Sequence, residues 1–434
     1  MLRRTVLPVL TVALLAGCGG PGAETPESYT LENGLTVVLR PINGADKVAL
    51  VVLHPMGGHH DPEGQSGLAH LIEHCIVTAQ GGPTPQRTMQ QYVARYPDGW
   101  NAQTGDRYTV VGCVFPPDRL EAELRDAAAR LGDLRITQAD LDREVPRVVL
   151  ELANMFGGMP MLAAHNLARE RVRPTPRGGR KGGRPDHVQA LTPDVLQERW
   201  QRYYRANNAT LILAGAIDPA SVRERIHYYC HTLPQGEPAP APANVPEPDL
   251  PATEVVQARA TNPNAEAVAC LAWAAPNPND DLYAPFLVLV ARLWQQVPGA
   301  AAGVGSPAVR FMPLDDPHVI SLAAPTGLQT PEQAVASLET VVDDAFDRPL
   351  APADLQVARN AFGWMLGVAD VPNRMLAGNP YGAAMAAGRC RQMGIDSADL
   401  RARLDAVTAE DVQRAAETLF APDRRAAVVV VPKR

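Results

Sequence analysis

Apolar and polar positions alternate along the early part of the chain in the way that β-strands require. Residues 29–41 are typical of a strand, an Asn-Gly turn and a second, alternating strand, and residues 47–55 indicate a further strand. Apolar residues then recur at helical spacing from Ser66 to Val77, with Ser66 as the expected N-cap. Because hairpins dominate over strand–helix–strand units, we expect a largely antiparallel sheet with helices packed on it.

This pattern returns in the second half of the chain. Residues 190–215 align without gaps on residues 406–431, and each copy is typical of a Thr-capped amphipathic helix, a turn and a β-branched strand. A polar, Pro-rich stretch at residues 233–254 separates the two copies and has the composition of an extended linker. The sequence therefore predicts an α+β fold of two duplicated domains, at residues 28–232 and 255–434.

The overall composition is that of an ordinary globular protein. Of the 434 residues, 46% are hydrophobic and 20% are charged, and the formal net charge is −7. The densest basic stretch, residues 171–184, is rich in Gly and Pro and has no aromatic residues, so we expect a mobile surface loop and no nucleic-acid partner. Apart from Cys18, the cysteines are odd in number, widely spaced and without a CxxC pair, which argues against a disulfide framework.

The N-terminus has the pattern of a targeting segment. Two arginines precede a short apolar stretch, which is too short to span a bilayer comfortably, so we expect residues 1–17 to be a signal peptide. The tetrapeptide ending at Cys18 resembles a bacterial lipobox, which implies lipidation of Cys18 and a flexible tether at residues 18–27. The alternative is an ordinary cleaved signal with a chance cysteine.

The stretch "GLAHLIEHCIV" carries the strongest chemical signal. His70 and His74 lie four residues apart on one face of the expected helix, a spacing that lets two imidazoles bind one Zn²⁺. Glu73 lies on the adjoining edge, where its carboxylate can take a proton from a water that the metal activates. Burying these three polar groups among apolar neighbours is costly unless they are paired or bind something.

Other metal-ligand candidates near this stretch are weaker. Cys75 follows His74 directly and points away from the ligand face, so we expect it not to bind metal. His59 and His60 fall in a Gly-flanked loop, for which we expect exposure to solvent.

The pentapeptide "HLIEH" resembles the inverted zinc signature of the pitrilysin and mitochondrial-processing-peptidase family of HxxEH metallopeptidases. Further stretches follow the family's pattern in order: "LENGLTVVL", "GQSGLAHLIEH", "WNAQTGDRYT", "YYRANNATLILAGAIDP" and the terminal "VTAEDVQRAAETLFAPDRRAAVVVV". The resemblance implies the short two-domain bacterial type, in which the two domains form a half-clamshell.

The resemblance also implies the rest of the metal site. In "DREVPRVVLELANM" it assigns Glu151 as the third zinc ligand and Glu144 as a residue that supports the site. Pro146 departs from the pattern, because it removes a helix hydrogen bond and should kink or restart the helix between Glu144 and Glu151. The segment "WNAQTGDRYT" resembles the family's edge strand, so Asn101, Ala102 and Gln103 are candidates for binding an extended peptide; an ordinary sheet strand is the alternative.

The second half lacks the zinc signature. At the repeat offset, the signature positions fall on Phe286, Leu289 and Val290. The family's second half also carries an Arg and a Tyr that hold substrate; here Arg310 is the candidate arginine, whereas the tyrosine position falls near Pro317 or His318. The resemblance therefore implies a homologous partner subunit that supplies the missing residues, with a homodimer, or His318 as a substitute donor, as alternatives.

The leading functional hypothesis is a zinc-dependent endopeptidase that cleaves peptides or small unfolded proteins. The signal segment implies the bacterial cell envelope, with a lipid anchor on the periplasmic face; Gly19 after the cysteine favours the outer membrane where one exists. The alternative is a non-catalytic peptide-binding or scaffolding subunit of a peptidase assembly. A metal-binding chaperone without hydrolysis is a third hypothesis.

Overall fold

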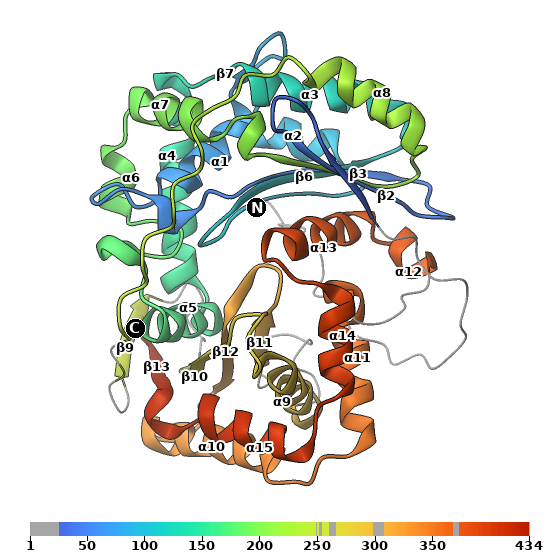
Figure 1. Cartoon of the computed structure of the whole chain (residues 1–434). Coiled ribbons are helices and arrows are strands. Elements are labelled where there is room, and N and C mark those ends of the chain that lie inside the picture. The colour runs from blue at the N-terminus through green and yellow to red at the C-terminus, as the bar shows by residue number, and fades with distance from the viewer. Residues whose placement is uncertain are drawn as a thin grey trace.

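The computed structural model describes residues 26–248, 250, 254–259, 266–297, 308–367 and 373–433. The expected signal peptide, Cys18 and most of the tether lie outside these residues. Figure 1 shows two sheet-containing halves, with the N-terminal half above and the C-terminal half below.

The first half is built on a six-stranded sheet in the order β1-β2-β8-β3-β6-β5. All its pairings are antiparallel except that of β2 with β8. The strands are β1 Glu27–Thr30, β2 Thr36–Pro41, β3 Val48–His54, β5 Trp100–Thr104, β6 Thr109–Phe115 and β8 Thr210–Gly215; β4 Gln80–Gly81 and β7 Leu134–Arg135 form a separate small pair.

The second half is built on a five-stranded sheet in the order β11-β12-β10-β13-β9. Its strands are β9 Glu254–Arg259, β10 Val268–Ala274, β11 Ala308–Met312, β12 Asp316–Pro325 and β13 Arg425–Lys433. The repeat strands β8 and β13 have equivalent neighbours, since each pairs parallel with one strand and antiparallel with the next. The predicted fold class, α+β with two duplicated and mostly antiparallel sheets, is confirmed.

Helices cover both sheets. In the first half they are α1 Leu68–Thr78, α2 Met89–Arg95, α3 Leu120–Gly132, α4 Gln138–Ala153, α5 Pro160–Val172, α6 Pro185–Ala190, α7 Pro193–Tyr203 and α8 Pro219–Cys230. In the second half they are α9 Tyr283–Gln296, α10 Pro331–Phe346, α11 Pro352–Leu366, α12 Asn373–Ala377, α13 Pro380–Gln392, α14 Ser397–Asp405 and α15 Ala409–Leu419. In the part of the chain that the structure describes, no helix is long and apolar enough to cross a membrane.

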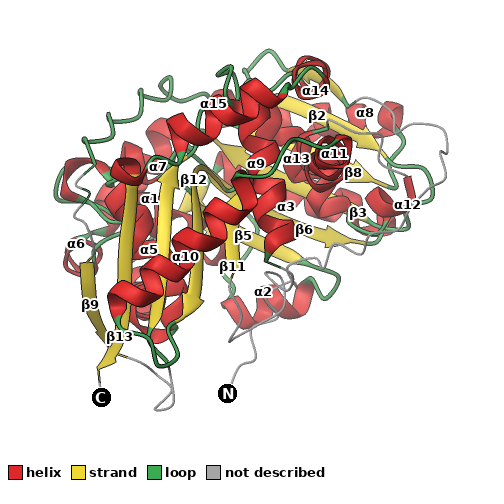
Figure 2. Ribbon diagram, turned by 90° about the horizontal axis from the view of Figure 1, so that it is seen from below, coloured by secondary structure: helices red, strands yellow, loops and turns green. Residues whose placement is uncertain are grey.

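Each sheet is covered on one face by a helix from the other half. Alternate residues of β10 point to opposite faces: Leu271 packs in the core around α9 and α10, whereas Cys270 packs against α5 of the first half. In the first sheet, Val51 packs against α13 of the second half. Figure 2 shows the second sheet between α5 and α10. The two halves are therefore interlocked by an exchange of helices.

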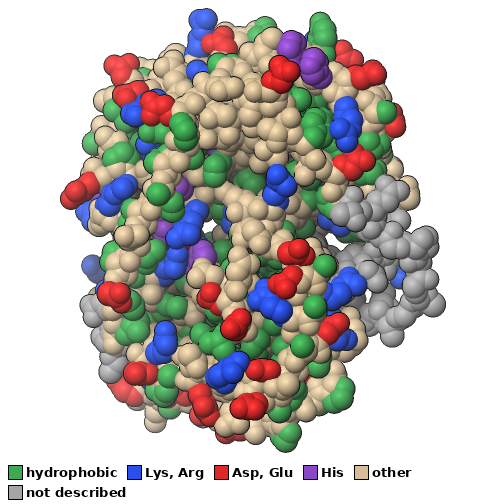
Figure 3. Space-filling view, viewed as in Figure 1, with side chains coloured by type: hydrophobic (Ala, Val, Ile, Leu, Met, Phe, Trp, Pro, Cys, Tyr) green, Lys and Arg blue, Asp and Glu red, His purple; other side chains and the backbone are tan. Residues whose placement is uncertain are grey.

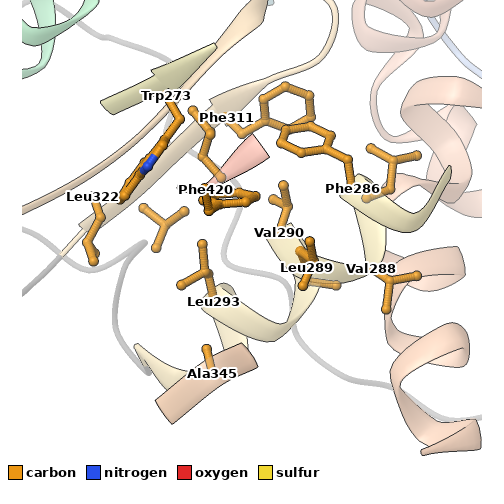
Figure 4. Close-up of a cluster of buried hydrophobic side chains, with 14 of the residues drawn as sticks. Trp273, Phe286, Val288, Leu289, Val290, Leu293, Phe311, Leu322, Ala345 and Phe420 are labelled. Atoms are coloured by element: carbon orange, nitrogen blue, oxygen red, sulfur yellow. The ribbon is translucent and has the colours of Figure 1, made fainter. Parts of the chain in front are cut away.

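The positions that correspond to the zinc signature are core residues in the second half. Phe286, Leu289 and Val290 lie on α9 and are fully buried in the apolar cluster around it (Figure 4). Because α9 is apolar, it packs between the second sheet and the outer helices. Among the described residues, no candidate metal-binding cluster includes a residue of α9.

The Pro-rich stretch runs along the first half without regular secondary structure over its described residues 233–248. It is tied down by backbone hydrogen bonds, such as the one from Ala243 N–H to the His59 carbonyl at 2.9 Å. The domain boundaries given above stay predictions.

Candidate metal centre

Helix α1 presents the candidate ligands and begins in an unusual way. Its N-cap is Gly67, which has φ +100° and makes no side-chain cap, so the predicted Ser66 cap is wrong. The Asp61 carboxylate takes over this role, because it accepts from the backbone N–H of Gly67 at 2.8 Å and of Ala69 at 3.0 Å. Ser66 instead accepts, through Oγ, from the backbone N–H of Arg184 at 3.1 Å.

The two histidines of α1 are both buried and both held by hydrogen bonds at Nδ1. His70 Nδ1 lies 2.9 Å from the carbonyl oxygen of Gly182, and His74 Nδ1 lies 3.2 Å from Glu144 Oε2. A carbonyl and a carboxylate only accept, so both rings carry their proton on Nδ1. This leaves Nε2 of each imidazole available as a metal ligand.

Helix α4 supplies both candidate glutamates. Ligand atoms of His70, His74 and Glu151 all lie within 4.8 Å of one another. Because zinc holds nitrogen and oxygen ligands at about 2.0–2.2 Å, small side-chain rotations bring this set onto one ion. Helix α4 runs on through Pro146 instead of restarting there. The residues thus fit a zinc ion.

Glu144 lies beneath the ligands and is fully buried. Burial alone would raise the pKa of its carboxyl, but the hydrogen bond from His74 and the charge of Arg147 together hold that pKa below its usual range. Arg143 Nε also donates to Glu144 at 2.9 Å. Glu144 is therefore an ionised acceptor that fixes the His74 ring.

Glu73 is buried beside the ligand set without belonging to it. Thr104 Oγ1, at the end of β5, donates to Glu73 Oε2 at 2.8 Å. Burial raises the pKa of Glu73 to about 7, although His70 and the Thr104 hydrogen bond act in the opposite direction. A carboxyl with a pKa near neutrality is suited to accept and return protons.

The candidate peptide-binding residues lie on an edge strand. Asn101, Ala102 and Gln103 belong to β5, which pairs with β6 on one side and ends the sheet on the other. All three are half-buried. An edge strand has unpaired backbone groups, so the geometry is compatible with strand addition.

Arg310 and His318 lie in the second half, on β11 and β12. Arg310 is half-buried and pairs with Ser321 across the hairpin. Burial, followed by the charge of Arg173, lowers the pKa of His318 to about 4. Tyr381 is on α13 instead, where its ring packs against Gly112 of the first sheet. The structure does not bring these residues into the metal-ligand set.

Several expectations around the site are wrong. His59 and His60 are buried in a short 3-10 turn, Gly58–His60, that packs against the β5–β6 turn, so they do not lie in a solvated loop. The end of the basic stretch also packs against the residues that precede α1, since Arg184 N–H donates to Ser66 Oγ and a Cβ on Gly183 would come within 2.6 Å of the Gly67 Cα. The expectation that Cys75 does not bind metal stays a prediction; its thiol is buried.

Thr104 and Gly182 also contact the site, although the sequence did not predict a role for them. They contact Glu73 and His70 from 31 and 112 positions along the chain. Nothing local in the sequence marks a threonine or a glycine for such a role.

Comparison with known proteins gives partial matches. Residues 190–296 match the family model described as "Peptidase M16 inactive domain". A protein named "Uncharacterized zinc protease" from Rickettsia bellii is 21% identical over 210 residues, which cover 48% of this chain and 50% of that protein. These matches support the M16 peptidase family. The chain spans about half the length of the curated relatives that it matches first.

Solved structures agree on the M16-like fold. A protease from Helicobacter pylori superimposes with a TM-score of 0.76 at 19% identity, over 94% of this chain and 100% of that chain. The first half of the periplasmic protease PqqL from Escherichia coli gives a TM-score of 0.64 at 17% identity, over 96% and 94% of the two chains. The M16 match at residues 190–296 does not include His70, His74 or Glu151, so the HxxEH assignment stays a prediction.

Proposed function

We propose that this chain is a zinc-dependent endopeptidase that cleaves peptides or small unfolded proteins. The observation that carries the proposal is the convergence of His70, His74 and Glu151, with Glu73 buried beside them. The names of M16-type relatives, which include a zinc protease, support both the metal and the reaction class.

In this proposal the side chains divide the work. His70, His74 and Glu151 would hold a zinc ion, which would supply Lewis-acid chemistry toward the scissile carbonyl and the attacking water. Glu73 takes the proton of the attacking water and gives it to the leaving amine. The unpaired edge of β5 aligns the peptide backbone, and Arg310 is a candidate contact for the substrate.

Replacing the base separates binding from catalysis. Glu73→Gln should keep zinc but lower peptide cleavage by about 10²–10⁴-fold, because an amide cannot accept the proton. His70→Ala should lose the metal itself. Zinc content by elemental analysis and cleavage of a fluorogenic peptide library measure the two effects, with Glu224→Gln, an exposed position on α8, as the matched control. Cleavage by Glu73→Gln at the parent rate would contradict the mechanism.

The second candidate is a non-catalytic peptide-binding subunit. Two observations favour it: β12 offers no tyrosine near His318, and the matching family model carries the word "inactive". The two candidates differ in one result: Glu73→Gln lowers cleavage by an endopeptidase, alone or in a pair, whereas in a non-catalytic subunit the same substitution leaves cleavage by an active partner unchanged.

We further propose a lipid-anchored location on the periplasmic face of a bacterial envelope. The support is the sequence around Cys18 and the "periplasmic" protease PqqL among the structural neighbours. Cys18→Ser should release the protein into a soluble fraction or leave an unprocessed precursor; unchanged membrane association would contradict the anchor.

A further inference from the structure

Four charged side chains form a cluster between the two halves, here called the charge cluster: Asp106, Arg169, Lys181 and Asp316. Arg169 on α5 donates through Nη2 to both Asp106 carboxylate oxygens at 2.5 Å, and through Nε to Asp316 Oδ2 at 3.2 Å. Lys181 Nζ donates to the same Asp316 oxygen at 2.6 Å. Asp316 is the first residue of β12, so it is the contribution of the second half.

The charge cluster is largely withdrawn from water. The side-chain exposed fractions are 3% for Arg169, 15% for Asp316 and 19% for Lys181. Burial alone would raise the pKa of Asp316, but Lys181 and Arg169 lower it well below its usual range. Removal of one partner from such a cluster leaves a buried charge uncompensated, so the remaining groups must move.

Lys181 is linked to the metal centre through the next residue of the chain. It precedes Gly182, whose carbonyl oxygen accepts from His70 Nδ1. Residues 176–184, here called the glycine loop, lie against the start of α1: a Cβ on Gly183 would come within 2.6 Å of the Gly67 Cα. Gly182 has φ +77° and Gly183 has φ +120°, conformations that favour glycine.

A small cavity connects the two groups of residues. Its lining includes His70 and Thr104 from the metal centre, and Asp106 and Lys181 from the charge cluster. Figure 3 shows an opening between the halves with His and Lys or Arg side chains at its edge.

We infer that Asp316 of the second half positions the metal ligand His70, acting through Lys181 and the Gly182 carbonyl. Asp316 holds the Lys181 ammonium group, which fixes the glycine loop, and the loop carbonyl fixes the ring and tautomer of His70. The second half thereby completes the metal site of the first half. This inference rests on the metal site of the proposed function and adds positioning residues to it.

The test measures zinc affinity of the full-length chain by competition with a chromophoric chelator. Lys181→Met and Asp316→Asn should each weaken zinc binding by about tenfold, since residues that orient a metal ligand commonly contribute 10–100-fold. The double variant should be little weaker than either single variant, because both act through one contact. Lys181→Arg, which keeps the charge, should retain most of the affinity.

Lys47→Met is the matched control. Lys47 Nζ lies 3.2 Å from an Asp98 carboxylate oxygen in an ion pair of the same type on the first half, with exposed fractions of 32% and 34%. Its removal should leave zinc affinity unchanged. If Asp316→Asn does not fold, as judged by thermal melting, the zinc affinity of Lys181→Met alone tests the inference.

Parent-like zinc affinity in a folded Lys181→Met variant would overturn the inference. So would additive losses in the double variant, because they would show two independent effects. Peptide cleavage does not enter the measurement: a chain whose zinc affinity depends on Lys181 but that cleaves nothing, alone or with a homologous partner, supports the positioning role and contradicts the endopeptidase proposal.

Discussion

At the scale of single residues, the metal centre depends on acceptors that hold the imidazole rings from behind. Glu144 is fully buried, accepts from His74 Nδ1 and is itself held by Arg143 and Arg147. A negative acceptor at Nδ1 raises the basicity of Nε2 and prevents the ring from turning.

Loss of this negative charge should weaken metal binding. Glu144→Gln is expected to lower zinc affinity by about 10–100-fold while the chain stays folded, because the amide accepts a weaker hydrogen bond than the carboxylate. Chelator competition measures the affinity, and Glu198→Gln, at an exposed position on α7, is the control. An affinity equal to that of the parent would remove Glu144 from the site.

The candidate ligands could be predicted from the sequence, whereas their partners could not. His70, Glu73 and His74 lie within one helical turn, so their spacing reports their shared face directly. Glu151 required the family resemblance. Thr104 and Gly182 meet the site through sheet pairing and loop packing, which depend on the whole fold. His59 was misjudged for the same reason, because flanking glycines do not reveal that another turn covers the loop.

At the scale of elements, the exchanged helices α5 and α13 decide how the halves join. Both are rich in small residues where they meet the sheets; Ala168 on α5 is fully buried in the cluster against the second sheet, and a Cβ on Gly388 of α13 would come within 2.8 Å of Ile212. The strand alternation and the repeat correctly predicted that each half is built on a mostly antiparallel sheet. The exchange of α5 and α13 was not predictable, because the apolar face of a helix does not indicate which of the two sheets the helix will cover.

Enlarging a side chain in this contact should destabilise the whole chain. Ala168→Leu is expected to lower the free energy of unfolding by about 1–3 kcal/mol, because three further carbons must fit where no space exists. Ala402→Leu, at an exposed position on α14, should change it little. Denaturant unfolding followed by circular dichroism compares the two; equal stability of both variants would contradict tight packing of α5.

At the scale of the whole molecule, the chain carries a full set of candidate metal ligands but an incomplete set of residues that would hold the oxyanion. The first half carries the candidate ligands and base, whereas Arg310 has no tyrosine beside it on β12. An oxyanion donor is worth several kcal/mol in such a reaction. We therefore propose a homologous partner subunit that supplies the Arg and Tyr, with a second copy of this chain or His318 as the alternatives.

Assays of the chain alone and with a co-purified homologue distinguish these cases. We expect cleavage by the lone chain to be at least about 10²-fold slower than that of the pair, the usual effect of one missing donor. Full activity of the chain alone that is lost in His318→Ala would contradict the partner and favour the histidine.

The helix exchange also sets an order of events during synthesis. The first sheet is complete once residue 215 has left the ribosome, but the helix that covers its inner face, α13, ends only at Gln392. At a translation rate of roughly 5–20 residues per second, some ten to thirty seconds pass before α13 can pack on Val38, Val51 and Ile212. The nascent first half therefore exposes an apolar sheet face during this interval, and its native packing can be completed only after nearly the whole chain has been made.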